Sequence, residues 1–181
     1  ARLPARAPGS RIDWNPWTSS RDNLRAAKQS RTVLLALLGL SWFWFYGALV
    51  LAQLPLYTQS VIGGDAGVVT LLLVVFSIGI GVGSMLCESL SDHRVEIGLV
   101  PFGSLGLTGF ALDLAYASPD SPAASLIGPA QFLAQGGSWR ILIDLAGLGV
   151  FGGFFVVPLY ALVQQRAKPE LLSRVIGANS I

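Results

Sequence analysis

Charged residues, cysteine and histidine are scarce in this chain. Of its 181 residues 12% are charged, and the sequence holds one Cys and one His. Soluble domains carry about 25% charged residues, so this chain has too little charge to cover a soluble surface. A single cysteine, Cys87, excludes an intrachain disulfide, and Cys87 with His93 cannot build a Cys/His zinc site. We therefore expect no metal and no cofactor.

The sequence also lacks the residue patterns of common enzymes. It has no recognisable set of nucleophile, base and orienting residue, and no phosphate-loop or zinc-binding spacing. Gly147, Gly149 and Gly152 match GxGxxG. A dinucleotide site would need a strand before these glycines and a soluble βαβ unit around them, and neither is indicated. No enzyme is predicted within this stretch.

Basic residues are few and lie in short segments beside apolar runs. This distribution argues against nucleic-acid binding, which needs basic residues gathered on one face of a domain. Residues 1–31 contain seven of the twelve Lys and Arg, and three prolines that disfavour a continuous helix. We expect this arm to be a basic cytoplasmic linker; an anchor on the lipid surface is the alternative.

Apolar residues, in contrast, form long runs. The chain is 52% hydrophobic and its mean hydropathy is +0.61. About 20 apolar residues cross a hydrocarbon core of roughly 30 Å. The runs predict an all-α fold, a polytopic membrane helix bundle over residues 32–181, with a short interfacial helix within 118–139. The expected spans are about 32–57, 67–87, 97–117 and 140–163, with the start of a fifth from about 175.

The basic residues also predict the orientation of the spans. Eleven of the twelve Lys and Arg fall on one side, in residues 1–31, 88–96 and 164–174, and Arg140 alone falls on the other. Cytoplasmic loops are enriched in Lys and Arg. The N-terminal arm is therefore expected in the cytoplasm, and residues 58–66 and 118–139 outside it.

Small residues and prolines within the spans predict how the helices pack. The pairs Gly79/Gly83 and Gly149/Gly153 have GxxxG spacing, which places two glycines on one helix face and lets a neighbouring helix approach closely. Pro55 is expected to kink or end the first span.

Aromatic and acidic residues supply the candidate site. Trp42, Trp44 and Phe45 belong to a mid-span aromatic block that also includes Phe43 and Tyr46. Packing and lipid contact is one interpretation, and a cavity wall that contacts acyl chains is the other.

The acids Glu88, Asp113 and Asp144 lie within or at the ends of spans and are candidates for headgroup binding or for proton or sodium coupling. For Asp113 and Asp144 a wetted helix end is the alternative. Arg140 and Asp144 are four residues apart on one helix and are expected to pair.

Two stretches resemble a known family. GSMLCESLSDHRVEIGLVPFGSLGLTGFALDL (Gly83–Leu114) and WRILIDLAGLGVFGGFFVVPLYALVQQRAKPELLSRVIGANSI (Trp139–Ile181) are similar to the lysophospholipid transporters of the major facilitator superfamily. The form fused to acyltransferase and acyl-activating domains looks most similar. The resemblance covers most of the chain from about residue 30.

The resemblance implies an architecture and a function. Such proteins have two six-helix halves, and this fragment would hold the central linker and the first four helices of the second half. It would help to move lysophospholipid across the bacterial inner membrane by alternating access, linked to reacylation and so to phospholipid remodelling. The implied partners are lysophospholipid or another amphiphile, the bilayer, the missing first half, and a fused or partner acyltransferase.

The superfamily's loop motif is only partly present. Asp92 and Arg94 align with the motif G-x-L-x-D-R-x-G-R-R and are candidate gating-loop residues. Glu88, however, stands where the motif has Gly, and His93 stands where it has Arg. Two other functions stay open: a non-transporting membrane scaffold that anchors an acyltransferase, and an exporter of another small molecule.

Overall fold

The computed structural model describes residues 30–91, 97–117 and 126–166. These ranges are helical apart from short connections and one isolated bridge, which confirms the predicted all-α fold. The N-terminal arm, the gating-loop candidates Asp92 and Arg94, and the expected fifth span lie outside the described residues. The elements are α2 (Arg31–Tyr57), η1 (Thr58–Ile62), α3 (Ala66–Leu90), α4 (Leu99–Tyr116), α5 (Pro129–Ala134) and α6 (Ser138–Arg166).

Four helical segments are long and apolar enough to cross a membrane: Arg31–Ile62, Ala66–Leu90, Leu99–Tyr116 and Ser138–Arg166. Their ranges overlap the four complete spans expected from the sequence. The chain is therefore a multi-pass membrane protein.

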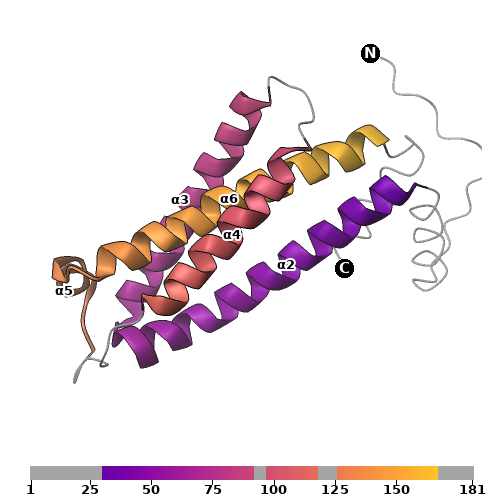
Figure 1. Cartoon of the computed structure of the whole chain (residues 1–181). Helices are drawn as coiled ribbons and strands as arrows, with labels where there is room; N and C mark the ends of the chain where they lie inside the picture. Colours follow the sequence, from indigo (N-terminus) through magenta and orange to yellow (C-terminus); the bar gives the residue numbers. More distant parts are fainter. Residues whose placement is uncertain (1–29, 92–96, 118–125, 167–181) are drawn as a thin grey trace, which may run out of the picture.

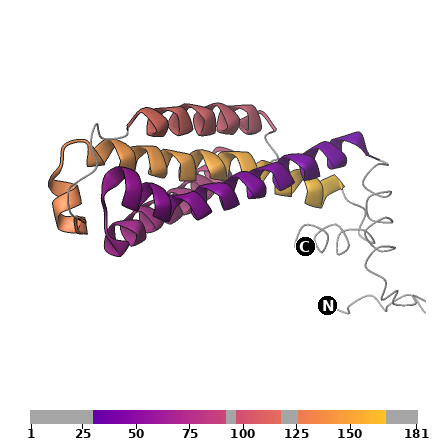
Figure 2. The ribbon, with the colours of Figure 1, turned by 90° about the horizontal axis from the view of Figure 1, so that it is seen from below.

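Helix α6 is the centre of the bundle. It lies between α3 and α4, and α2 packs along the same helix (Figures 1 and 2). In its most apolar stretch 67% of the residues are buried, against 11–22% in the other three spans. Those spans keep large apolar side chains exposed, as a lipid solvent permits. About half of the buried side chains of the described residues therefore come from α6.

The closest helix contact joins α3 to α6 through glycines of both helices. On the α3 side, a Cβ placed on Gly83 would lie 2.2 Å from the backbone oxygen of Val150. One placed on Gly79 would lie 2.5 Å from the backbone oxygen of Ala146. The first GxxxG pair therefore faces the backbone of α6 directly.

The second GxxxG pair meets the same interface from the α6 side. A Cβ placed on Gly149 would lie 2.5 Å from the Phe76 oxygen. One placed on Gly153 would lie 2.6 Å from the backbone carbon of Gly83 and from the backbone nitrogen of Ser84. Both pairs thus lie at one interface, where the two backbones touch without side chains between them.

The first span ends differently from the prediction. Pro55 does not end the helix: α2 continues to Tyr57, the expected end of the span, and passes directly into the π-helical turn η1. The Thr58 hydroxyl donates to the Leu54 carbonyl at 2.8 Å, and the Thr58 backbone N–H donates to the Leu54 and Pro55 carbonyls. Thr58 is fully buried. These bonds satisfy the Leu54 and Pro55 carbonyl groups, and the helical segment continues through η1 to Ile62. The loop expected at residues 58–66 is therefore reduced to Gly63, Gly64 and Asp65.

The two connections at this end of the bundle are tied together. The Ile127 N–H donates to the Gly63 carbonyl at 2.8 Å, and the Asp65 N–H donates to the Ile127 carbonyl at 3.0 Å. Gly63 adopts φ 72°, which favours glycine. Asp65 caps α3 by accepting from the Val68 N–H at 3.0 Å. The short helix α5 follows, within the region where one was expected (Figure 1).

Candidate functional site

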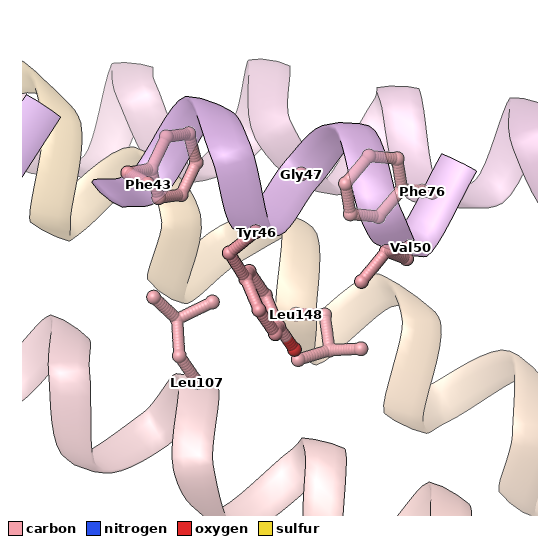
Figure 3. Close-up of a pocket in the computed structure, with 7 residues that line it drawn as sticks. All are labelled: Phe43, Tyr46, Gly47, Val50, Phe76, Leu107 and Leu148. Atoms are coloured by element: carbon pink, nitrogen blue, oxygen red, sulfur yellow. The ribbon is translucent and has the colours of Figure 1, made fainter. Parts of the chain in front are cut away.

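Four helices enclose a small apolar hollow near the middle of the bundle. Its lining comes from α2, α3, α4 and α6, and Tyr46 reaches from α2 between Leu107 and Leu148 (Figure 3). Apart from the Tyr46 hydroxyl the lining side chains are hydrocarbon. The lining residues are Phe43, Tyr46, Gly47, Val50, Phe76, Leu107 and Leu148.

The predicted cavity wall is only partly correct. Trp42, Trp44 and Phe45 are more than half exposed and do not line this hollow. The reason is the helical period: Phe43, Tyr46, Gly47 and Val50 follow the i, i+3, i+4, i+7 spacing of one face. The neighbouring aromatic residues point elsewhere.

These exposed aromatic side chains also make contacts within α2 and between α2 and α6. Trp42 stacks on Tyr46 with ring centroids 5.6 Å apart. The Trp44 Nε1–H donates to the Tyr160 hydroxyl at 3.0 Å and so joins α2 to α6. Phe45 is 64% exposed. They fit the interpretation of packing and lipid contact better than that of a wall around this hollow.

A charged cluster lies at the end of the bundle that holds α5. Arg140 Nε donates to Asp113 Oδ2 at 2.9 Å, and Arg140 Nη2 donates to Asp113 Oδ1. The sequence had predicted that Arg140 pairs with Asp144 along α6. The structure instead gives a bidentate pair between α4 and α6, because the planar guanidinium fork matches both oxygens of one carboxylate.

Asp144 is the buried member of this cluster. Its residue is 1% exposed, and its Oδ2 has no hydrogen-bond partner among the described residues. Asp144 lies one helical turn after Arg140, the residue of α6 that bonds to Asp113. A wetted helix end is therefore wrong for Asp144. The Asp113–Arg140 pair is about half exposed and can reach water or headgroups.

The cluster and the hollow are neighbours along α6. Asp144 precedes Leu148, which lines the hollow, by four residues. At 1.5 Å per residue this is about 6 Å, or one helical turn. An apolar space thus lies next to a site with one guanidinium and two carboxyl groups. The hollow measures about 10 Å³, about the space of one water molecule, so the helices would have to move apart before it could take part of a hydrocarbon chain.

Glu88 is separate from this site. It is exposed near the C-terminal end of α3, at the opposite end of the bundle from Asp113 and Asp144 (Figure 1). The structure therefore brings together two of the three candidate acids. Within the described ranges, no group of three or more His, Cys, Asp and Glu could hold a metal ion.

The glycines expected to pack helices are also separate from the hollow and from the charged cluster. None of them lines the hollow, and each faces backbone atoms of the opposite helix: Gly79, Gly83, Gly149 and Gly153. Their place is the contact between α3 and α6. A ligand has no room between backbones at this distance, so these four residues act in packing.

Of the lining residues, Phe43 and Tyr46 belong to the predicted aromatic block, whereas sequence reasoning missed Leu107 and Leu148. Leu107 and Leu148 carried no signal that separates them from other apolar residues in their spans.

Known proteins match the whole chain. The model of the Major Facilitator Superfamily matches residues 2–181. The lysophospholipid transporter LplT of Klebsiella pneumoniae (strain 342) is 31% identical over 170 residues, which is 92% of this chain and 38% of the relative. LplT of Cronobacter sakazakii is 29% identical over 182 residues, which is 99% of this chain and 40% of the relative.

The chain thus spans well under half the length of these relatives, and no solved structure matches it significantly. The family match covers nearly every residue and agrees with the bundle of long apolar helices. This chain belongs to the Major Facilitator Superfamily.

Proposed function

We propose that this chain is part of a transporter that moves lysophospholipid across the bacterial inner membrane, between its leaflets, by alternating access. The observation that carries the proposal is the apolar hollow one helical turn from the Asp113–Arg140–Asp144 cluster. Relatives named lysophospholipid transporters support the substrate class.

A lysophospholipid has one acyl chain and a charged headgroup. The hydrocarbon lining of the hollow matches an acyl chain in polarity, and the hollow would widen to admit one during transport. Arg140, which bonds to Asp113 in this structure, offers a guanidinium that binds phosphate well. The carboxyl groups of Asp113 and Asp144 can meet a cationic headgroup. The exposed aromatic side chains of α2 provide further apolar surface beside this route.

Alternating access needs parts that move as rigid units. The glycine contacts between α3 and α6 leave no side chains at that interface to rearrange, so this pair suits one rigid unit. In transporters of this type two bundles rock around a site near the membrane midplane. We infer that the second bundle comes from the remaining part of the protein.

The orientation follows from the basic residues. We propose that residues 1–31 and the C-terminal end of α6 lie in the cytoplasm, since eleven of twelve Lys and Arg belong to that side. The Asp113–Arg140–Asp144 cluster then lies toward the outer leaflet. A fused or partner acyltransferase on the cytoplasmic side would receive the lysophospholipid.

A leaflet-resolved assay tests this function. The full-length protein is reconstituted into liposomes, a labelled lysophospholipid is added outside, and the label protected from an impermeant quencher is followed over time. We expect protection to rise faster than in protein-free liposomes. Equal rates would refute transport and favour a scaffold that anchors an acyltransferase. Equal acceleration of an unrelated amphiphile would refute the lysophospholipid assignment.

A further inference from the structure

The Tyr46 hydroxyl faces an apolar space without a hydrogen-bond partner among the described residues. Tyr46 lies well inside the spanning helix α2 (Arg31–Tyr57), far from water at either end. The other side chains that line the hollow are hydrocarbon. A hydroxyl in such a place costs free energy unless it forms a hydrogen bond. The fold therefore leaves one donor at the hollow for a group that the described helices do not supply.

The ring of Tyr46 is held in a fixed direction. It stacks on Trp42, one helical turn earlier, with ring centroids 5.6 Å apart and planes 7° from parallel. From there it extends between Leu107 of α4 and Leu148 of α6, with the hydroxyl oxygen at its tip (Figure 3). The hydroxyl is thus presented to the hollow from a defined position.

A resident water is a poor partner for this hydroxyl. The hollow measures about 10 Å³, the least space that holds one water, and a buried water needs two or more polar partners. Tyr46 brings the one polar side-chain group among the lining residues, and the backbone groups of the helices bond within their own helices. A hydrogen-bond acceptor that arrives with a ligand needs no second polar partner.

The surroundings indicate which acceptor this is. A phosphate or an ammonium group would have to lose its water in a hydrocarbon hollow, which is costly. An ester carbonyl is uncharged and accepts a hydrogen bond from a single donor. In a lysophospholipid the ester lies between the headgroup and the acyl chain. Arg140 precedes Leu148 by eight residues on α6, about 12 Å along the axis. A lipid with its headgroup toward Arg140 and its chain toward the hollow carries the ester between them.

We propose that Tyr46 donates a hydrogen bond to the acyl ester carbonyl of a lysophospholipid when the hollow widens around it. Tyr46 then selects lipids with an ester-linked chain over lipids with an ether-linked chain, which lack this carbonyl. The inference rests on the proposed function, because it names the group of the transported lipid that this part of the route recognises.

A matched pair of lipids tests the proposal. The leaflet-resolved assay is run on the full-length protein with an ester-linked lysophospholipid and with an ether-linked one of the same headgroup and chain length. We expect the wild type to move the ester lipid about threefold faster, the factor that corresponds to an average hydrogen bond inside a membrane. Tyr46→Phe deletes only the hydroxyl and should move both lipids at the same rate.

Tyr116→Phe is the control variant. Tyr116 ends α4, is 79% exposed and does not line the hollow, so its variant should keep the ester preference. Equal rates for the two lipids in the wild type would overturn the proposal. So would an ester preference that persists in Tyr46→Phe.

Infrared spectroscopy gives a second readout that needs no transport. The ester carbonyl of the lysophospholipid is labelled with ¹³C and bound to the full-length protein in detergent micelles. A hydrogen bond lowers the carbonyl stretching frequency, so a shifted band should appear with the wild type and Tyr116→Phe and disappear with Tyr46→Phe. The same band in all three proteins would overturn the role of Tyr46.

The two proposals can fail separately. Movement of both lipids at equal rates by the wild type would refute the role of Tyr46 and leave the transport function. If neither lipid moves faster than in protein-free liposomes, the proposed function fails, and the infrared band still decides whether Tyr46 binds the ester.

Discussion

The glycine contact between α3 and α6 predicts a large difference between two substitutions on one helix. Gly83 and Gly81 both lie in α3, two residues apart. A Cβ at position 83 would lie 2.2 Å from the Val150 oxygen and 2.6 Å from the Val150 Cα, whereas one at position 81 would meet nothing within 4 Å. Gly83→Ala should therefore weaken the bundle, and Gly81→Ala is its matched control.

The expected loss of stability in Gly83→Ala depends on which atoms must move to make room for the new methyl group. The atoms facing Gly83 are backbone, so no flexible side chain can turn away, and the helices must separate by about 1 Å to reach normal contact distance. Overpacking of this kind costs about 1–3 kcal/mol. Replacing glycine by alanine also favours a helix by up to about 1 kcal/mol. That gain is common to both variants, so their difference isolates the packing cost.

The assay is reversible unfolding of the full-length protein in mixed detergent micelles, with helix content as the signal. We expect Gly83→Ala to be about 1–3 kcal/mol less stable than Gly81→Ala. Gly153→Ala faces the backbone of Gly83 from α6 and should behave like Gly83→Ala, with a non-additive double variant. A difference within roughly 0.5 kcal/mol, the range of ordinary surface substitutions, would refute the packing argument.

Three further predictions concern other parts of the chain. Glu88→Gln should lower lysophospholipid uptake by removing a charge at the end of α3 that we propose faces the cytoplasm; unchanged uptake would show that this charge has no role in transport. Trp44→Phe deletes the donor to Tyr160 and should cost about 0.6 kcal/mol in the same unfolding assay, an average for hydrogen bonds between membrane helices. No loss would mean that lipid or water replaces this bond. A reporter inserted within residues 118–125 should report from outside the cytoplasm, and a cytoplasmic signal would refute the orientation.

Hydropathy was enough to predict the fold class and the presence of four long apolar helices. Each span needs a long apolar run, and the runs here are separated by short polar segments. The end of the first span was predicted less well. The sequence showed Pro55 as a helix breaker, but did not show that Thr58 would bond to the Leu54 carbonyl and carry the helix on.

The candidate site could be predicted only in part. The sequence singled out Asp113 and Asp144 because acids are rare in these spans. It could not show that Arg140 prefers Asp113 to Asp144, since that choice depends on how α4 lies against α6. It also could not show that Asp144 is buried.

For the glycines, spacing alone indicated which residues share a helix face. It did not indicate that Gly79 and Gly83 of α3 would meet Gly149 and Gly153 of α6 at a single contact. Two GxxxG pairs can each face a different neighbour, and only the arrangement of the helices decides between these possibilities.

For the aromatic block, composition identified the segment of α2 that contributes to the hollow. The rotation of that helix then placed Phe43 at the hollow and left Trp42, Trp44 and Phe45 largely outside it. Orientation about the helix axis comes from packing against neighbours, which a single sequence does not specify.

The most direct test of the account is to fill the hollow and measure transport. Gly47 lines the hollow, and a Cβ there would meet nothing within 4 Å, so the side chain of Gly47→Leu can begin without a clash at Cβ and extend over this small hollow. Gly109 of α4 is equally open and does not line the hollow, so Gly109→Leu is the control. In the leaflet-resolved assay, lysophospholipid movement should slow several-fold in Gly47→Leu and stay near wild type in Gly109→Leu. Equal rates in the two variants would contradict the assignment of this hollow to the lipid route.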